Sequence, residues 1–424
     1  MDMLIKGATI ITQNAKRDTL QGDILISGSR IAQVGKRISE KAEFKIDAKG
    51  KLAMPGLINM HTHLAMSIFR GYGEGLPLER WLKEKVWPME AKETPADAHV
   101  ASQLALLEML RSGTTAFNEM CMLGAKEIAE AANEAGVRGH VCQGIFDLLP
   151  GRTLGGELKT MERCAYPPEG LVSFGISPHA VYTCSEELLA KANEFAMRRK
   201  LRIHTHAAET RKEVFDLQKK SGKRVLEYLG GLGLLRQGSI FAHCGWVTKK
   251  EISLAGKKRL SVVHCPASNL KLATGGICPI SEFDREGANV CIGTDSAASN
   301  NSLNMFESVK LAALLQKHMY WKADILSAQK ALDFATRNGA EALGLDCGRI
   351  EQGALADIIL LERGPNMVPM HDPVSNIVYA ANPSNVSDVI INGRLVMENR
   401  KIKTMDEQAV LQKAEELAKE IEKR

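Results

Sequence analysis

The chain has 424 residues, of which 45% are hydrophobic and 25% charged, and its formal net charge is +5. Such a composition can bury a large core, and this length predicts one domain of roughly 300 residues plus a smaller module. The basic clusters contain no interleaved aromatic residues, and no apolar stretch approaches the ~20 residues that span a bilayer. We therefore expect neither a nucleic acid nor a membrane as a partner, and a cytoplasmic protein because no signal segment is evident.

Both ends of the chain contain segments whose apolar pattern predicts β-strands. Residues 4–12 and 23–34 alternate or run apolar between turn residues, and residues 356–361 and 389–396 repeat this pattern. These strands need partners, so we expect one small β-sandwich built from both termini. The predicted division is residues 1–53 and 351–424 for the sandwich, with a terminal helix over 406–423, and residues 54–350 for the larger central domain.

The first strand of the central region ends in two histidines. Residues 52–59 are almost entirely apolar, and the segment Met60-His61-Thr62-His63 follows them directly. Because alternate residues of a strand share a face, both imidazoles can reach one metal ion. A histidine pair of this kind is weak evidence alone, since each histidine could be a hydrogen-bonded core residue.

Seven further apolar runs end in polar, chemically capable residues. Segments with helical periodicity lie between them, for example residues 96–111, 125–135, 186–199 and 211–229. Eight strands alternating with helices predict an α/β fold, a parallel (β/α)8 TIM-type barrel whose active site lies at the carboxyl ends of the strands. The seven runs are residues 115–119, 139–143, 171–179, 202–209, 239–243, 260–264 and 289–295.

The polar residues at these strand ends resemble a known family. The order His61-x-His63, His206-x-x-Glu209, His243 and Asp295 is similar to the amidohydrolase superfamily, in its mononuclear-metal deaminase branch. Residues 55–63, 264–272 and 293–301 resemble the methylthioadenosine/S-adenosylhomocysteine deaminase group, which includes 5'-deoxyadenosine deaminases. The resemblance implies a hydrolase that converts 5'-substituted adenosines to inosine analogues and ammonia.

The implied metal ligands are His61, His63, His206 and Asp295. Three neutral imidazoles and a carboxylate suit Zn(II) and leave a position for water, whose pKa such a metal lowers to about 7. Fe(II) and Mn(II) also tolerate this set. Binuclear relatives commonly use a lysine at the end of the fourth strand, and residues 176–179 contain none, so we expect one metal per subunit.

The resemblance also implies the roles of residues near the metal. Glu209 would bind the purine and donate a proton to its N1, His243 would polarise the attacking water, and Asp295 would accept the proton of that water.

Substrate contacts follow from the same resemblance. Trp81 and Glu90 would cover the nucleoside and accept its ribose hydroxyls, His179 would contact the ribose, and Ser299 the purine. Each has a structural alternative: Trp81 could anchor a helix and Ser299 could cap a turn.

One position departs from relatives that bind the amino acid tail of S-adenosylhomocysteine. They tend to carry an arginine where this chain has Gln143, and only Arg152 could fill the second arginine place. We expect substrates without a charged tail to be favoured.

Several matters stay open at this stage. Another substrate of the superfamily, such as guanine, cytosine, a triazine or a cyclic amide, is the main alternative, and a non-catalytic scaffold is a weaker one. His204 is expected to pack in the barrel rather than bind metal, and His264 could touch the site or be structural. A homo-oligomer, either a dimer or a tetramer, is expected from the resemblance.

Overall fold

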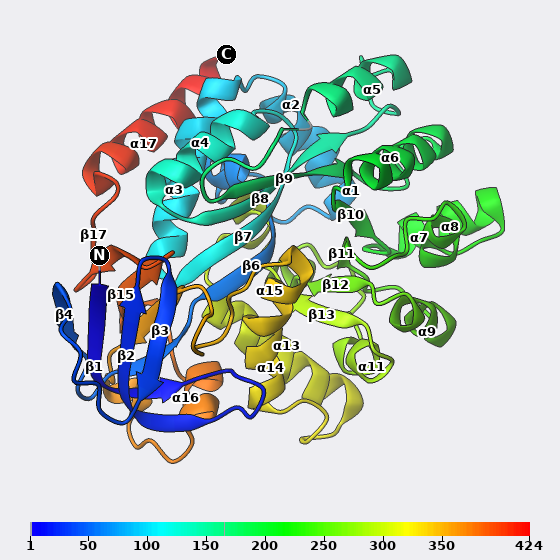
Figure 1. Ribbon diagram of the computed structural model, residues 1–424. Helices are drawn as coiled ribbons and strands as arrows, with labels where there is room; N and C mark the ends of the chain where they lie inside the picture. Colours follow the sequence, from blue (N-terminus) through cyan, green and yellow to red (C-terminus); the bar gives the residue numbers. More distant parts are fainter. Residues whose placement is uncertain (1, 165) are drawn as a thin grey trace.

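A computed structural model describes residues 2–164 and 166–424. Its centre is a sheet of eight parallel strands in the order β13 to β6, each paired with its sequence neighbour (Figure 1). The amide of Asp295, just past β13, donates to the carbonyl of His61 on β6 over 2.9 Å, so the sheet nearly closes into a barrel. The strands are β6 (Leu57–Thr62), β7 (Thr114–Cys121), β8 (Arg138–Ile145), β9 (Val172–Pro178), β10 (Ile203–Ala207), β11 (Ser239–His243), β12 (Ser261–His264) and β13 (Asn289–Ile292).

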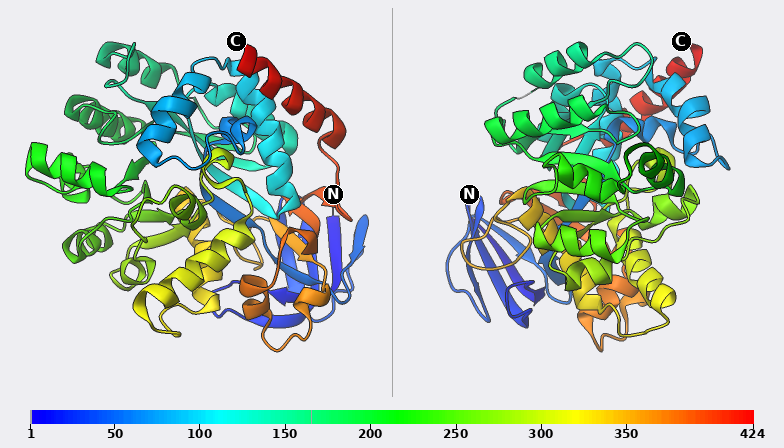
Figure 2. Two further views of the ribbon diagram at one scale, coloured as in Figure 1. Left: turned by 180° about the vertical axis from the view of Figure 1, so that it is seen from behind. Right: turned by 90° about the vertical axis from the view of Figure 1, so that its right-hand side faces the viewer.

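Helices surround this barrel, as Figure 2 shows from two further sides. The segment 211–229, expected as one helical stretch, forms two helices because Gly222 ends the first in the left-handed conformation, with φ at 72°. The helices are α3 (Pro95–Arg111), α4 (Ala125–Ala135), α5 (Leu154–Arg163), α6 (Glu186–Arg199), α7 (Arg211–Ser221), α8 (Val225–Gly231), α9 (Lys249–Lys257), α10 (Pro266–Lys271), α11 (Ile280–Arg285), α12 (Ala297–Asn300), α13 (Met305–Tyr320), α14 (Ala328–Phe334) and α15 (Arg337–Leu343).

A chain of short helices follows β6 and lies over the carboxyl ends of the strands. It contains the 3-10 helix η1 (Leu64–Phe69), α1 (Leu78–Trp81), the π-helical turn η2 (Leu82–Val86) and α2 (Trp87–Glu90). A π-helical turn is uncommon and is frequently found at functional sites.

The two termini build a second sheet beside the barrel, visible in blue and orange in Figures 1 and 2. Nine strands form one mixed sheet, in which β5 from the N-terminal part pairs with β14 from the C-terminal part. Its strands are β1 (Asp2–Ile11), β2 (Thr19–Ser27), β3 (Arg30–Gly35), β4 (Phe44–Asp47), β5 (Leu52–Pro55), β14 (Ile358–Leu361), β15 (Val386–Ile391), β16 (Arg394–Glu398) and β17 (Lys401–Ile402).

The expected (β/α)8 barrel is therefore confirmed. The small β-sandwich expected from both termini is confirmed as a β module that the two termini build together, and its strands form one mixed sheet. The domain boundaries at residues 53 and 350 stay a prediction. Gly56 is the single residue between β5 of the terminal sheet and β6 of the barrel, and a Cβ there would lie 2.1 Å from the Thr115 side chain. The chain can thus pass from one sheet to the other only with glycine at this place.

The remaining C-terminal elements are η3 (Pro365–Met367), α16 (Pro373–Tyr379), η4 (Pro383–Asn385) and α17 (Glu407–Lys423). Helix α17 lies against α3, where Arg424 bonds to Asp97 over 2.6 Å. No helix among the described residues is both long and apolar enough to span a membrane. All nine cysteines are free thiols.

Candidate active site

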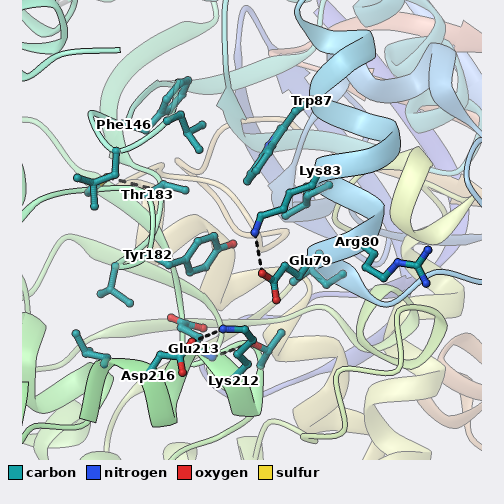
Figure 3. Close-up of a pocket in the computed structure, with 18 of the residues that line it drawn as sticks. Glu79, Arg80, Lys83, Trp87, Phe146, Tyr182, Thr183, Lys212, Glu213 and Asp216 are labelled. Atoms are coloured by element: carbon teal, nitrogen blue, oxygen red, sulfur yellow. Dashed lines mark hydrogen bonds and ion pairs between the residues drawn. The ribbon is translucent and has the colours of Figure 1, made fainter. Parts of the chain in front are cut away.

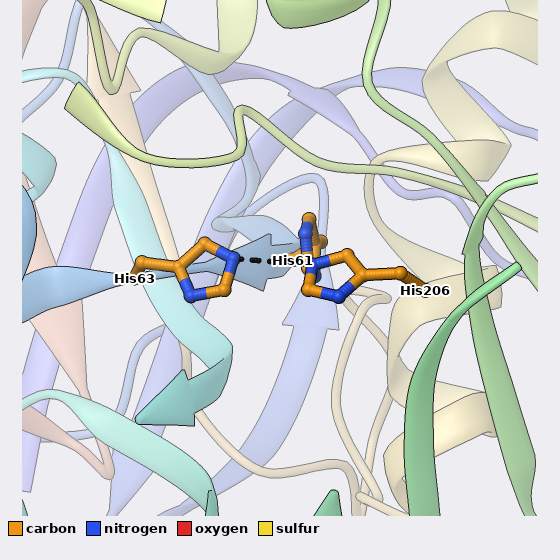
Figure 4. Close-up of side chains that lie close together, drawn as sticks. All are labelled: His61, His63 and His206. Carbon is orange, nitrogen blue, oxygen red and sulfur yellow. Dashed lines mark hydrogen bonds between the residues drawn. The ribbon is translucent and has the colours of Figure 1, made fainter. Parts of the chain in front are cut away.

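Three strands deliver the four predicted metal ligands to one point. His61 lies on β6 and His63 directly follows it, His206 lies on β10, and Asp295 lies three residues past β13. The Nε2 atoms of His63 and His206 are 3.3 Å apart (Figure 4), and Asp295 Oδ1 lies 3.6 Å from His61 Nε2 and 3.5 Å from His63 Nε2. Ligands bound tetrahedrally at 2.0–2.1 Å from zinc are about 3.3 Å apart, so this spacing fits such a metal.

The hydrogen bonds of two histidines show which ring nitrogens are free. His63 Nδ1 lies 2.7 Å from the carbonyl oxygen of Met120, and His206 Nδ1 lies 3.0 Å from that of His179. A carbonyl only accepts, so each Nδ1 donates its proton and each neutral ring has a bare lone pair on Nε2. Burial lowers the pKa of both imidazoles, which keeps them neutral. Two lone pairs facing each other need a cation between them.

The third imidazole has the same need. His61 is fully buried, and its Nε2 has no hydrogen-bond partner among the described residues. Buried polar atoms rarely lack a partner, and an ion is one of the recognised explanations. These donors fit one divalent cation.

Two residues that sequence reasoning did not place at the site support these ligands. His204 Nε2 lies 2.9 Å from His61 Nδ1, so it orients the ring of a predicted metal ligand. The carboxylate of Glu119, at the end of β7, accepts bonds from the Thr62 hydroxyl at 2.6 Å and the Leu64 amide at 3.0 Å, on both sides of His63. For Glu119 the available signal was its position near the end of β7, and for His204 it was the strand face that it shares with His206.

Glu209 and His243 lie beside the ligand cluster. Glu209 follows β10 by two residues, and its amide and that of Ala208 donate to the buried carboxylate of Glu213 at 2.7 and 3.0 Å. The loop is thereby fixed, and Glu209 Oε1 lies 3.8 Å from His243 Nε2. Burial, and then the charge of Asp295, raise the pKa of Glu209 well above the ordinary value, which favours a protonated carboxyl group.

The backbone at this end of the barrel is strained. His243 and Asp295 adopt φ values of 73° and 64°, in a left-handed region that non-glycine residues seldom occupy. Such conformations cost free energy and are concentrated at functional sites.

Two adjoining cavities lead to the cluster. The inner cavity, of about 50 Å³, contains the free faces of His63, His206, Glu209, His243 and Asp295. The outer cavity is about 1220 Å³ and opens beside it (Figure 3). Trp87 and Tyr182 are among the residues that line both, so they lie at the passage between them.

The structure divides the predicted substrate residues between these cavities. Trp81, Glu90, His179 and Ser299 line the inner cavity. Burial raises the pKa of Glu90 to about 7. Arg152 lines the outer cavity, where its guanidinium lies over the Phe146 ring and 3.3 Å from the buried carboxylate of Glu157.

Gln143 and His264 contribute less directly. The Gln143 amide donates to the carbonyls of Met122 and Gly144, and within the described chain this residue lines neither cavity. His264 is buried, and neither of its ring nitrogens has a hydrogen-bond partner among the described residues.

Comparison with known proteins agrees with this arrangement. Residues 52–396 match the model of the amidohydrolase family. The chain belongs to the amidohydrolase family. A 5'-deoxyadenosine deaminase of Methanosphaera stadtmanae is 39% identical to this amidohydrolase, over 99% of each chain. A 5-methylthioadenosine/S-adenosylhomocysteine deaminase of Clostridium tetani is 40% identical, also over 99% of each chain.

A solved structure extends the comparison to the fold of this amidohydrolase. The adenosine deaminase from Xanthomonas campestris, described with bound zinc, superimposes with a TM-score of 0.95 at 32% identity, and the match covers 100% of this chain and 99% of that one. The predicted resemblance to the deaminase group of the superfamily is thus confirmed.

Proposed function

We propose that this amidohydrolase deaminates 5'-substituted adenosines, using one divalent cation per subunit, with zinc as the first candidate. The observation that supports this proposal most is the convergence of three imidazole nitrogens and Asp295 in one buried cluster beside Glu209. The named activities of the relatives in Methanosphaera stadtmanae and Clostridium tetani support the choice of substrate class.

The chemistry requires water to add at C6 of the purine and ammonia to leave. A divalent cation held by His61, His63, His206 and Asp295 would supply an activated water as the nucleophile. Asp295 Oδ1 faces the imidazole nitrogens and is placed to accept the proton of that water. Protonated Glu209 donates to N1 as the purine becomes tetrahedral at C6.

In the second half of the reaction N1 keeps its proton. Glu209, now a carboxylate, takes the proton of the C6 hydroxyl and passes it to the departing amine, so C6 becomes a carbonyl carbon and the products are the inosine analogue and ammonia. The proton held by Asp295 then restores protonated Glu209. His243, 3.8 Å from Glu209, polarises the attacking water.

In this proposal the inner and outer cavities bind different parts of the substrate. The purine and ribose lie against Trp81, Glu90, His179 and Ser299, and the 5' substituent extends into the outer cavity. Because Glu157 already pairs with Arg152, a carboxylate on the 5' substituent gains little binding free energy from this guanidinium. We therefore expect 5'-deoxyadenosine and 5'-methylthioadenosine to be preferred over S-adenosylhomocysteine.

Ammonia release by metal-reconstituted protein tests this function. The panel contains those three compounds, adenosine, guanine, cytosine and a triazine, with each purine product identified by its ultraviolet spectrum. Turnover of the 5'-substituted adenosines with the expected ranking supports the proposal. Turnover of guanine, cytosine or the triazine alone would contradict it and assign another amidohydrolase activity.

The assembly is a separate expectation. We propose a homo-oligomer, either a dimer or a tetramer, and light scattering of the intact chain measures its mass. A mass of one chain would overturn this expectation without affecting the proposed chemistry.

A further inference from the structure

Two adjacent residues of α10 contact the two groups that flank the reacting water in the proposed function. Ser268 and Asn269 lie within the 264–272 motif, and their exposed fractions are 0% and 6%. Ser268 reaches Asp295, which follows β13, and Asn269 reaches His243, at the end of β11. One helical turn therefore contacts residues delivered by two different strands.

The hydroxyl of Ser268 fixes the carboxylate of Asp295. Ser268 Oγ donates to Asp295 Oδ2 over 2.6 Å, while the Ser296 amide donates to Oδ1 over 2.7 Å. Since a carboxylate only accepts, the single Ser268 proton goes to Oδ2. The two donors hold the carboxylate plane, with Oδ1 turned towards the imidazole nitrogens of His61 and His63.

Ser299 extends this chain of hydroxyls. Its Oγ lies 2.9 Å from Ser268 Oγ and 3.0 Å from Ser296 Oγ. Because the Ser268 proton is already committed to Asp295, the Ser299 hydroxyl can donate to Ser268. Ser268 is thus the junction between the wall of the inner cavity and the carboxylate.

Asn269 acts on the ring of His243 in the same way. Its Nδ2 lies 3.1 Å from His243 Nδ1. An amide nitrogen donates, so Nδ1 accepts and the proton of the neutral ring resides on Nε2, which faces Glu209 in the inner cavity. His243 then acts as a hydrogen-bond donor to the reacting oxygen rather than as a base.

Helix α10 is itself held against the Asp295 loop. Lys271 Nζ donates to the carbonyl of Ala298 at 3.1 Å and to Asn301 Oδ1 at 2.6 Å. Groups held by a fixed element keep their orientation through the reaction, which is how a supporting residue contributes to rate.

We propose that Ser268 and Asn269 are positioning residues of the deamination: Ser268 fixes the carboxylate of Asp295 with Oδ1 towards the reacting water, and Asn269 fixes the His243 proton on Nε2. This inference rests on the proposed function for its kinetic part. Neither residue needs to touch the substrate.

Variants at Ser268 test the kinetic part in the metal-loaded enzyme with 5'-deoxyadenosine. Ser268→Ala should lower kcat about 10- to 100-fold, the usual consequence of slight misplacement, while KM and metal content stay within about twofold of wild type. Ser268→Thr retains the hydroxyl and should recover most of kcat. The matched control is Ser308→Ala in α13, since Ser308 is equally buried and its hydroxyl has no partner among the described residues.

An unchanged kcat in Ser268→Ala, or an equal loss in Ser308→Ala, would overturn the role of Ser268. A crystal structure of Ser268→Ala provides a readout that does not depend on activity, because the Asp295 carboxylate should rotate. An unrotated carboxylate contradicts the inference even if the enzyme has a different substrate.

The Asn269 part has its own structural readout. In protein labelled with ¹⁵N-histidine, long-range NMR correlations should show the proton of His243 on Nε2 in the wild type and on Nδ1 in Asn269→Asp, whose carboxylate accepts. The His243→Gln spectrum assigns the resonance. A wild-type proton on Nδ1 would overturn the role of Asn269, whereas a failure of every adenosine substrate would overturn only the proposed function.

Discussion

Two buried polar clusters at opposite ends of the barrel differ in how their groups are paired. At the amino end, the Arg138 guanidinium at the start of β8 bonds to both carboxylate oxygens of Asp357, at 2.6 and 3.1 Å, and to Asn392 at 2.8 Å. At the carboxyl end, His61 Nε2 and Asn269 Oδ1 have no partner among the described residues. The paired groups hold the terminal sheet to the barrel, whereas the bare imidazole nitrogens of the ligand cluster at the carboxyl end mark where a cation fits.

This difference predicts separable effects. Substitutions at the carboxyl end should remove activity and leave the fold intact, because the strands are packed independently of the site. Substitutions at the amino end should destabilise the protein and leave the chemistry of the folded fraction unchanged.

Loss of a metal ligand should have the largest effect. We expect His63→Ala to lose metal and deaminase activity together, because the remaining donors no longer enclose the cation. Metal analysis alongside ammonia release measures both quantities. The exposed His371→Ala is the control and should retain metal. Full metal content in His63→Ala would mean that His63 is not a ligand.

Removal of the proposed general acid, Glu209, should have the second largest effect. Glu209→Gln keeps the shape of the side chain but cannot transfer a proton, so kcat should fall by about two to four orders of magnitude. Metal content and melting temperature should stay near those of wild type. Turnover close to wild type would exclude Glu209 as the proton donor.

A substitution at the amino end should lower the stability of the protein and leave its activity unchanged. Arg138→Met leaves Asp357, which is 2% exposed, without its cation, and removing one partner of a buried pair costs about 3–5 kcal/mol. Denaturant unfolding measures this loss. The matched control is Arg198→Met, whose exposed pair with Glu162 should contribute at most about 1 kcal/mol. Equal losses of unfolding free energy in both variants would contradict the different contributions assigned to the buried and the exposed ion pair.

The smallest effect is expected in the outer cavity. Glu157→Gln removes the charge that engages Arg152 and frees the guanidinium for a substrate carboxylate. The ratio of kcat/KM for S-adenosylhomocysteine to that for 5'-deoxyadenosine should rise about 3- to 5-fold, as expected for a partly exposed pair. A fall in this kcat/KM ratio would instead indicate that Glu157 helps to bind the amino acid tail of S-adenosylhomocysteine.

The sequence predicted the barrel from periodicity, because apolar runs mark strands and parallel strands bring their carboxyl ends together. The set of metal ligands came from the family resemblance, and the structure brings those four residues together. The supporting contacts did not follow, because they join residues far apart in the chain. His204 meets His61 across 143 positions, and Ser268 meets Asp295 across 27. A serine or buried histidine has many possible partners, and only the folded chain selects one.

The most direct test of the account is the anomalous diffraction of crystals of the zinc-loaded protein. We predict one peak at the carboxyl end of the barrel, about 2.0–2.2 Å from the Nε2 atoms of His61, His63 and His206 and from one oxygen of Asp295. No peak there, or a second metal beside the first, would contradict the claim that these converging groups hold a single cation.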